Sequence, residues 1–421
     1  MIEGFKNKDT RSKIIFTLLM LAIYAIGTSI PIPFVDREVL ADLFTKDNTG
    51  LFELFNMFTG GSFQNFTLFA LGVTPYITAS IIVQLFTIAF PYFENLAKEG
   101  ETGRKKMQTI TRYGTIILSL IQGAGIAYGL FRNALTTQNA LSIVTILMLL
   151  TAGTAFLMWL GEQINEYGIG NGMSLLIFAG IVIRLPATVI EIKTKYSEGA
   201  ISIVGIILTI IGALLLIASV VLLNEGSRKI PVQYAKRVVG RKTIGGAASH
   251  IPIKMNPAGV IPVIFSLSIL QLPITISYFK PNSDFTAWVT KYLSTNGTPG
   301  VYIYLILNFA FTVAFTFFYG RIMFKTDEVA KNLAANGGSI PGIRPGKATE
   351  EYLDGIMTRL CWIGGFALAA ICSVPTLLSA FTPLNLTFGG TSLIIIVGVA
   401  LDTVRQIQNR NTMTTHRGFL R

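Results

Sequence analysis

Charged side chains are scarce in this chain: only 13% of its 421 residues are Asp, Glu, Lys or Arg, whereas 51% are hydrophobic. An ordinary soluble protein carries about twice that share of charge. Cysteine and histidine are also rare, with two of each: Cys361, Cys372, His250 and His416. This supply excludes a disulfide framework and a site built from several cysteines or histidines. The composition therefore predicts a protein made for a lipid bilayer, with no metal and no cofactor.

Long apolar runs are abundant instead. A helix that crosses a bilayer needs about 20 mainly apolar residues. The sequence contains ten such runs, at roughly 14–30, 66–90, 113–131, 140–161, 171–190, 200–223, 257–279, 300–320, 357–377 and 387–404. We therefore expect an all-α polytopic membrane protein with ten transmembrane helices. The first run follows a basic leader, as in a signal peptide, but it has no small-residue cleavage pattern, so we expect it to be retained.

The net charge of +12 is unevenly distributed along the chain. Most Lys and Arg residues fall in segments that ten crossings place on the same side of the membrane as the N-terminus. Basic residues mark the cytoplasmic side of membrane proteins. The sequence therefore predicts that both termini are cytoplasmic.

Two of the predicted cytoplasmic segments are much longer than a turn requires. Segment 224–256 carries seven basic residues, and segment 321–356 contains the turn sequence Pro341-Gly342-Ile343-Arg344-Pro345-Gly346. The basic residues of 224–256 are Arg228, Lys229, Lys236, Arg237, Arg241, Lys242 and Lys254. Composition leaves two interpretations open: solvated loops that lie on lipid, or a docking site for a large partner rich in phosphate, such as RNA.

The first external segment, 31–65, is rich in phenylalanine, which is unusual for an exposed linker. Within it, residues 51–58 predict a short helix that follows the possible N-caps Asn48 and Thr49 and stops at Gly60-Gly61. Such a short helix cannot cross a membrane. It either lies flat at the interface or tucks back among the long helices.

An odd number of spans in each half would make the two halves of a ten-span chain inverted relative to each other. We place these halves at 1–190 and 191–421. The spans 66–90 and 257–279 then correspond, and both contain proline and polar residues. These are Thr74, Pro75 and Gln84 in the first, and Pro257, Pro262, Ser266, Ser268, Gln271 and Pro273 in the second. Paired broken helices indicate a pathway between the halves, although kinked helices that only pack are the alternative.

The span interiors hold essentially no ionisable side chains, although ion and proton routes usually need them. The sequence also lacks the short motifs of metalloproteases, serine hydrolases, phosphate-binding loops and dinucleotide sites. Any pathway is therefore expected to have apolar walls and no catalytic role. A secondary transporter of a small solute, which also uses inverted repeats and broken helices, remains the second hypothesis.

Short motifs are spread in one order over nearly the whole chain. They are Asn56-Met57-Phe58-Thr59-Gly60-Gly61, the stretch from Phe69 to Leu85, the stretch from Lys98 to Lys105, Met158-Trp159-Leu160-Gly161-Glu162-Gln163-Ile164, the stretch from Gly168 to Ser174, Tyr234-Ala235-Lys236-Arg237, the stretch from Pro341 to Gly346, and Phe388-Gly389-Gly390-Thr391-Ser392-Leu393. Together they strongly resemble the SecY family, the central channel subunit of the bacterial Sec protein translocase.

The resemblance implies two inverted five-helix halves that form a clamshell around an hourglass pore. It also implies residues for each part of the channel. The apolar pore ring falls on Val73, Ile77, Met173, Ile177, Ile264 and Ile395. The plug, at about 51–65, falls on Phe52, Phe55, Asn56, Met57, Phe58, Gly60 and Gly61. The lateral gate, through which hydrophobic segments leave sideways, falls on Ile81, Gln84, Ser266, Ser268 and Gln271.

The resemblance further implies a function and partners. The chain would pass unfolded secretory polypeptides across the bacterial plasma membrane and release hydrophobic segments into the bilayer, with no enzymatic activity of its own. The ribosome and the SecA ATPase would dock on the long loops. Contact residues are expected at Lys236, Arg237, Arg241, Lys242 and Arg344. Further expected partners are the SecE subunit, a SecG subunit, signal sequences, nascent chains and membrane lipid. Energy would come from the motor, the ribosome or the membrane potential.

Overall fold

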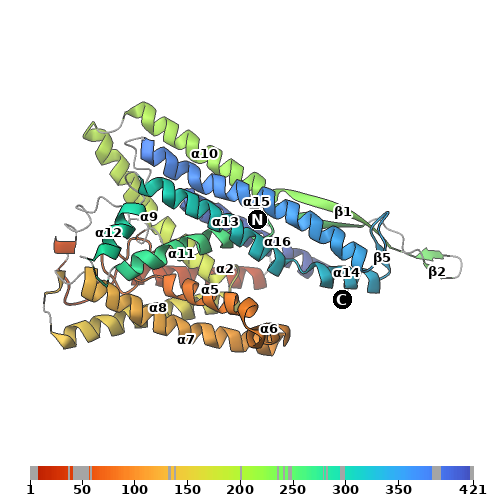
Figure 1. Cartoon of the computed structure of the whole chain (residues 1–421), viewed down its shortest axis with the longest axis horizontal. Coiled ribbons are helices and arrows are strands. Elements are labelled where there is room, and N and C mark those ends of the chain that lie inside the picture. The colour runs from red at the N-terminus through yellow and green to blue at the C-terminus, as the bar shows by residue number, and fades with distance from the viewer. Residues whose placement is uncertain are drawn as a thin grey trace.

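In the part of the chain that the structure describes, ten long helices lie side by side, and a smaller arm of loops projects from one end (Figure 1). The computed structural model describes residues 8–36, 38–40, 56, 59–130, 134–136, 139–199, 202–234, 237–239, 242–244, 249–277, 279–280, 283–293, 299–381 and 390–417. The long helices are α2 (Lys8–Gly27), α5 (Thr74–Ala89), α7 (Glu101–Gly125), α8 (Ala140–Tyr167), α9 (Gly172–Ser197), α10 (Ile203–Glu225), α11 (Ile261–Ser277), α13 (Gly300–Met323), α15 (Lys347–Phe381) and α16 (Gly390–Arg417).

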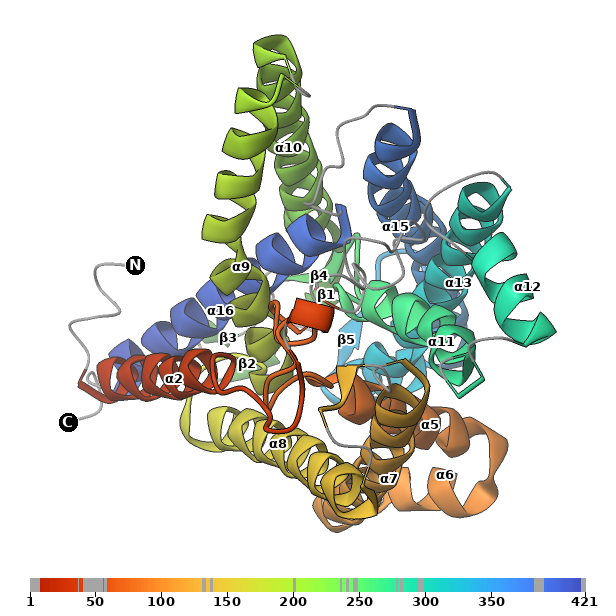
Figure 2. The same ribbon diagram turned by 90° about the vertical axis from the view of Figure 1, so that its left-hand side faces the viewer.

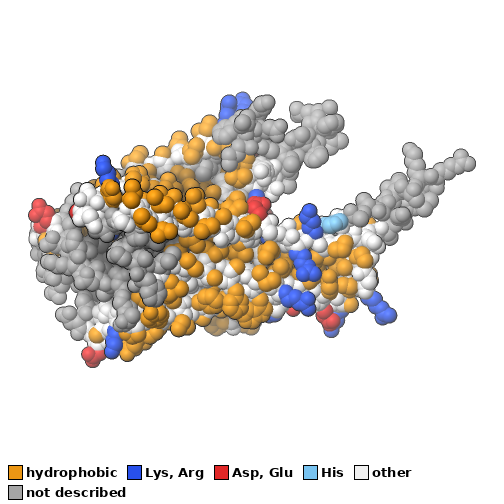
Figure 3. Space-filling model, turned by 90° about the horizontal axis from the view of Figure 1, so that it is seen from above, with side chains coloured by type: hydrophobic (Ala, Val, Ile, Leu, Met, Phe, Trp, Pro, Cys, Tyr) orange, Lys and Arg blue, Asp and Glu red, His pale blue; other side chains and the backbone are white. Residues whose placement is uncertain are grey.

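Every predicted span has a helix. By length and composition, seven helices of the described residues can cross a membrane. The other three predicted spans are occupied by α7, whose first turns are polar, and by the shorter α5 and α11. On the face shown in Figure 3, hydrophobic side chains cover the middle of the bundle, and charged side chains lie toward its two ends, with most of the visible Lys and Arg toward the arm, as expected of a bundle surrounded by lipid.

Two helix boundaries differ from the sequence prediction. The span predicted at 66–90 is helical only from Thr74, so Pro75 lies in the first turn of α5 and does not interrupt it. Pro262 likewise lies at the start of α11, and Pro273 alone is inside that helix. Proline suits a first turn because its missing N–H has no partner there in any helix. The helices α5 and α11 are therefore shortened at their starts and less broken than predicted.

The last helix is longer than the predicted span. Sequence placed the end of that span near residue 404, whereas α16 continues to Arg417. The predicted boundary between the halves, near residue 190, lies within α9, which ends at Ser197. Seen from the end of the bundle, α2, α8, α7 and α5 lie along one side, α11, α13 and α15 lie on another, and α9 rises beside α10 and α16 (Figure 2).

The two long loops form one arm with its own core. Strands β1 (Ser227–Tyr234) and β4 (Ser249–Lys254) pair antiparallel, and β5 (Gly338–Ser339) from the second loop pairs with the other edge of β1. A second hairpin, β2 (Arg237–Val239) with β3 (Lys242–Ile244), extends beyond the sheet. The helix α14 (Thr326–Ala335) and the first turns of α15 pack beside the sheet. Buried apolar side chains from both loops, including Val232, Leu333 and Leu353, form a cluster between them.

The smaller helices lie at the ends of the bundle. α5 turns by 100° into α6 (Pro91–Lys98), and α7 continues as a π-helical turn, η1 (Ile126–Leu130). The helix α12 (Asp284–Tyr292) follows α11.

Candidate functional site

The six predicted ring residues come from four helices that surround the centre of the bundle. Val73 and Ile77 lie at the start of α5, Met173 and Ile177 at the start of α9, Ile264 in α11 and Ile395 in α16. Each side chain is at most 7% exposed, and all six belong to one continuous cluster of buried apolar residues. The fold thus gathers into one apolar core residues that are up to 322 positions apart in the chain.

The turn before α9 fixes where Met173 lies. Gly172 is packed so closely on α8 that a β-carbon would lie 1.9 Å from the carbonyl oxygen of Gly161. The Asn171 side chain caps α9 by accepting a hydrogen bond from the Ser174 backbone N–H, at 3.2 Å. Met173 itself lies against Gly161, where a β-carbon would meet its sulfur at 2.8 Å. Small residues therefore allow the thioether to lie in the cluster.

A cavity of about 440 Å³ opens next to Ile264, on the side of the arm. Its lining combines polar and apolar residues, whereas the cluster is apolar. Its polar and charged lining residues are Asn171, Ser174, Asn224, Lys254, Asn256, Asp402, Thr403, Arg405, Gln406 and Asn409. The cavity therefore borders the buried apolar cluster at Ile264.

Hydrogen bonds around this cavity join helices that are distant in sequence. Arg405 of α16 donates to the backbone carbonyl of Asn224 at 2.6 Å, and so completes the end of α10. Asn256 donates to the Asn224 side chain at 3.1 Å. The backbone N–H of Gly170, before α9, donates to Gln406 of α16 at 3.0 Å. These pairs could not be predicted from the sequence, because they depend on tertiary contacts.

The predicted plug lies partly outside the described residues. Phe52, Phe55, Met57 and Phe58 fall there, whereas Asn56, Gly60 and Gly61 are described. The buried Asn56 side chain donates to Gln64 Oε1 at 2.9 Å and accepts from the Gln64 backbone N–H at 3.1 Å.

Gly60 has a positive φ of 64° and lies directly on α9: a β-carbon would lie 2.8 Å from the α-carbon of Gly180. The turn at Gly60, within the predicted plug, is therefore packed backbone to backbone against the helix that carries Met173 and Ile177.

The predicted lateral gate residues occupy α5 and α11, which contact each other in the bundle. We call the line where α5 and α7 face α11 and α13 the seam. Gln84 of α5 accepts a hydrogen bond from the Tyr319 hydroxyl of α13, and its own amide donates to Ser80 at 3.2 Å. The predicted residue Gln84 therefore has a partner on the opposite side of the seam.

The remaining gate residues do not bond across the seam. Ser266 donates within its own side, to Asn308 Oδ1 of α13 at 2.7 Å, and Ser268 donates to the Ile264 carbonyl of its own helix at 2.8 Å. Ile81 and Gln271 are buried. Sequence reasoning missed Tyr319 and Asn308, although a polar side chain inside an apolar span is a signal that could have found them.

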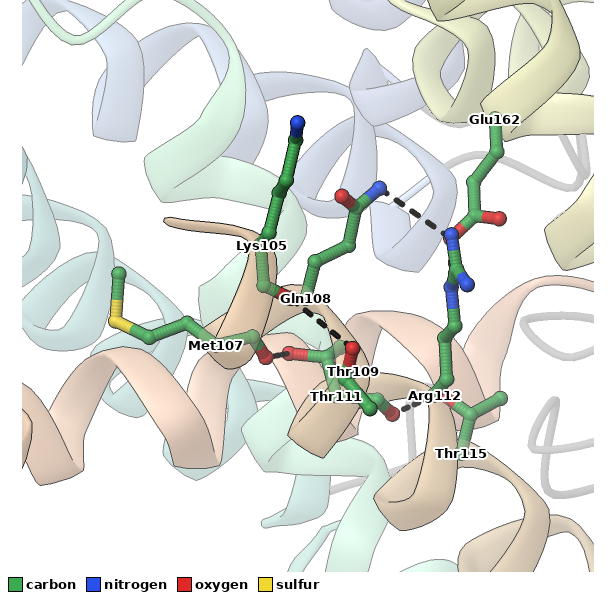
Figure 4. A network of polar contacts seen from close by, with 8 residues as sticks. All are labelled: Lys105, Met107, Gln108, Thr109, Thr111, Arg112, Thr115 and Glu162. Carbon is green, nitrogen blue, oxygen red and sulfur yellow. Dashed lines mark hydrogen bonds and ion pairs between the residues drawn. The ribbon is translucent and has the colours of Figure 1, made fainter. Parts of the chain in front are cut away.

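The helix α7 is joined to α8 by a polar network (Figure 4). Glu162 of α8 accepts from Arg112 Nε at 2.7 Å and from Gln108 at 3.3 Å. The Glu162 side chain is only 13% exposed, so these two donors replace much of the water that would otherwise surround its carboxylate.

The predicted docking residues lie on the arm where they are described. Arg344 is exposed at the turn before α15, and its carbonyl accepts from the Thr349 hydroxyl at 2.9 Å. Arg237 and Lys242 lie in the β2–β3 hairpin, and Lys236 and Arg241 fall outside the described residues.

Comparison with known proteins gives consistent matches. A family model described as SecY matches residues 67–404. The chain is 43% identical to the protein translocase subunit SecY of Streptomyces scabiei, over 100% of this chain and 99% of the relative. It is 42% identical to that of Bacillus subtilis strain 168, over 98% of this chain and 97% of the relative.

Solved structures have the same fold. One is described as a protein conducting channel (TM-score 0.66, 20% identity, covering 95% of this chain and 92% of that one). A second concerns the plug domain of a SecY protein, which stabilises the closed state of the translocation channel (TM-score 0.64, 20% identity, covering 95% of this chain and 92% of that one). A third is Sec61 in a canine ribosome–channel complex from the endoplasmic reticulum (TM-score 0.64, 19% identity, covering 95% of this chain and 92% of that one). The chain therefore belongs to the SecY family of protein translocase subunits, and it is a multi-pass membrane protein that forms a protein-conducting channel.

Proposed function

We propose that unfolded secretory polypeptides pass through the cavity beside Ile264, then through a ring formed by Val73, Ile77, Met173, Ile177, Ile264 and Ile395, to the far side of the membrane. One observation carries this proposal: four helices from both ends of the sequence bury these six apolar side chains in one cluster, and the cavity opens directly onto Ile264. The secondary transporter is set aside, because the family is one of protein translocase subunits.

An apolar ring suits a substrate of variable sequence. Ions and water find no group there to replace their hydration, so a narrow apolar passage excludes them. A polypeptide makes only weak, non-directional contacts with such a ring, whatever its side chains. The ring can therefore yield to a chain and still oppose ion flow.

The segment at about 51–65 closes the resting channel in this proposal. Support comes from Gly60, which packs on α9 next to the ring, and from the buried Asn56. The plug of the related SecY protein has the same role of stabilising a closed state.

The seam serves as the lateral exit. Its side chains are mostly apolar, and among the described residues of these helices one side-chain hydrogen bond crosses it, from Tyr319 to Gln84. A hydrophobic segment that leaves the pore can replace such contacts by lipid and by its own apolar surface.

The arm faces the cytoplasm in this proposal, and both termini lie on that side of a bacterial plasma membrane. The charged surface of the arm supports this orientation (Figure 3). The ribosome, as in the related canine complex, and the SecA ATPase would dock on the arm. SecE and SecG would complete the channel. Energy would come from the motor, from chain elongation or from the membrane potential.

A photocrosslinker placed at Ile177 tests the path. We expect an arrested secretory precursor to be captured there, because Ile177 lies in the proposed ring. The matched control is Val189 of the same helix, which is 62% exposed on the outer surface of the bundle. Equal capture at both positions, or capture at Val189 alone, would overturn the proposed path.

A further inference from the structure

Two short helices lie at opposite ends of the bundle, each attached to one of two corresponding membrane helices. The helix α6 follows α5, and α12 follows α11. Both α5 and α11 carry predicted ring residues near their starts. From there α5 runs toward the arm and α11 runs away from it, so that α6 lies at the arm end and α12 at the far end (Figure 1). The inverted arrangement of the halves therefore places one short helix at each face of the membrane.

One side of α12 is fixed to the bundle. Val289 and Leu293, one turn apart, are 0% and 4% exposed, and the helix contacts α11 and α13. The Thr286 hydroxyl donates to the Lys280 carbonyl at 2.8 Å and lies 3.1 Å from the Ser277 carbonyl at the end of α11. The orientation of α12 about its own axis is therefore set by the protein.

A second side of α12 exposes aromatic rings. Phe285, Trp288 and Tyr292 follow one another at helical spacing and share this side. Phe285 is 42% exposed and Trp288 51%, and the Trp288 ring centroid lies 6.4 Å from that of Phe285 and 5.7 Å from that of Tyr292. The exposed Asp284 and Lys291 lie on the remaining side of the helix. The helix therefore has one side for the bundle, one for an apolar or mixed surrounding and one for water.

The helix α6 has the same division. Leu96 is 3% exposed and packs on α7, where a β-carbon on Gly103 would lie 1.8 Å from the Leu96 carbonyl oxygen. Tyr92, one turn before Leu96 and on the same side, is 63% exposed. On the opposite side Glu94 and Lys98 form an exposed ion pair of 2.6 Å.

Aromatic rings also fill the bend between α5 and α6. The ring centroid of Phe86, in the last turn of α5, lies 5.2 Å from that of Phe90 and 5.5 Å from that of Phe93. Phe86 is 37% exposed and Phe90 50%. The chain bends by 100° here, so α6 is nearly perpendicular to α5. This is the orientation of a helix that lies in the plane of the membrane surface beside a helix that crosses it.

We propose that α6 and α12 are interfacial anchors, whose aromatic sides lie in the boundary between lipid headgroups and acyl chains, α6 in the leaflet on the side of the arm and α12 in the opposite leaflet. Tryptophan and tyrosine prefer this boundary, because their rings are apolar and their N–H or O–H groups are polar. Lipid is the occupant that the surroundings favour. The aromatic sides continue the exposed apolar surface of the neighbouring membrane helices, including Ile88 of α5, which is 64% exposed, and Ile276 of α11, which is 58% exposed.

The proposal gives the ends of α5 and α11 a fixed depth. Each helix has predicted ring residues near its start and an anchor after its end, and the two anchors lie in opposite leaflets. The bilayer itself would thus hold the two helices in place from its two surfaces.

The fluorescence of Trp288 tests the position of α12. The chain has three tryptophans, so Trp159→Phe and Trp362→Phe leave Trp288 alone, and the further change Trp288→Phe gives the background from other subunits. The complete translocase is placed in vesicles of phospholipids brominated either near the headgroup or near the end of the acyl chain. We expect the larger loss of emission with bromine near the headgroup, and little loss with aqueous iodide. Stronger quenching by iodide or by deep bromine would overturn the proposal, as would protection from all three quenchers, which would show that a protein covers this side.

Matched positions on the same helices test which side faces lipid. In the tryptophan-free chain, Ala287→Trp places the probe on the exposed side of α12 away from Trp288. Tyr92→Trp and Glu94→Trp make the same comparison on α6. We expect shallow bromine to quench Tyr92→Trp, and iodide to quench Ala287→Trp and Glu94→Trp. Equal quenching of the two positions on either helix would overturn the assignment for that helix.

Lipids of increasing acyl-chain length distinguish an anchor from a helix that only touches lipid. An anchored helix keeps its level relative to the headgroups when the bilayer thickens, because the bilayer or the protein adapts at modest cost. We therefore expect Trp288 and Tyr92→Trp to stay most sensitive to bromine near the headgroup in every lipid. A shift toward quenching by deep bromine in thicker bilayers would overturn the anchoring.

Discussion

Replacing Gly60 by alanine is expected to raise the ion leak of the resting channel far more than the same change at Gly61. Both glycines have a positive φ, 64° and 87°, so alanine strains the backbone at either position. They differ in their surroundings. A β-carbon on Gly60 would lie 2.8 Å from Cα and 2.9 Å from the carbonyl oxygen of Gly180, whereas one on Gly61 would meet nothing within 4 Å.

The size of the difference follows from these distances. The positive φ costs about 1–2 kcal/mol for alanine at each position, and this term cancels between the two variants. Crowding at Gly60 adds about 1–3 kcal/mol, because the atoms that it meets belong to backbone and cannot turn away as a side chain would. If the turn must lie on α9 to keep the channel closed, the fraction of channels in which the turn has left α9 differs between the two variants by about 5-fold to 150-fold.

Conductance of the purified translocase in planar bilayers, without substrate, measures this population. Gly60→Ala is expected to show frequent openings, and Gly61→Ala to stay near the unaltered channel. Gly180→Ala gives an independent check, since its β-carbon would lie 2.9 Å from the Tyr24 hydroxyl and 3.4 Å from the Gly60 backbone nitrogen. Equal leak for Gly60→Ala and Gly61→Ala would refute the reasoning.

Three further changes have defined outcomes. Arg344→Glu, which reverses an exposed charge on the arm, is expected to impair precursor transport into vesicles, and normal transport at normal membrane levels would contradict a docking role. Removal of 52–63 should raise the resting leak, and unchanged conductance in planar bilayers would count against sealing by this segment. Arg112→Met should lower the melting temperature of the complex in detergent, because it leaves the poorly exposed Glu162 with a weaker set of donors. Lys105→Met, which breaks a fully solvated pair with its neighbour on the same helix, should not, and equal shifts for the two would refute the argument.

The membrane helices could be predicted from composition because each apolar run is long enough to form a membrane-spanning helix by itself. Each of the ten predicted spans contains a helix, and the ten-helix fold is confirmed by the similarity to known channels. The starts of α5 and α11 were wrong because Pro75 and Pro262 were taken as interruptions, whereas the helices begin at these prolines. Hydropathy reports how apolar a segment is, and it does not report whether a proline ends a turn or starts a helix.

The candidate site was partly accessible from the sequence. The ring residues were identified by resemblance, and the structure buries them together, although their role in the pore stays a prediction. Gln84 was found as a polar residue in an apolar span, but its partner Tyr319 is 235 positions away, and no local pattern joins the two. The strands of the arm were missed for a similar reason, because β1 is completed by β5 from a different loop.

The length of α15 has a mechanical consequence. Its 35 residues span about 52 Å, which exceeds the roughly 30 Å of a bilayer core, and its first turns belong to the arm. The same rod lies along α13, the helix that bears Asn308 and Tyr319. A displacement of the arm end of α15 is therefore transmitted along this one helix to the part of α13 that lies inside the membrane. A partner that binds the arm can in this way affect the position of the membrane helices.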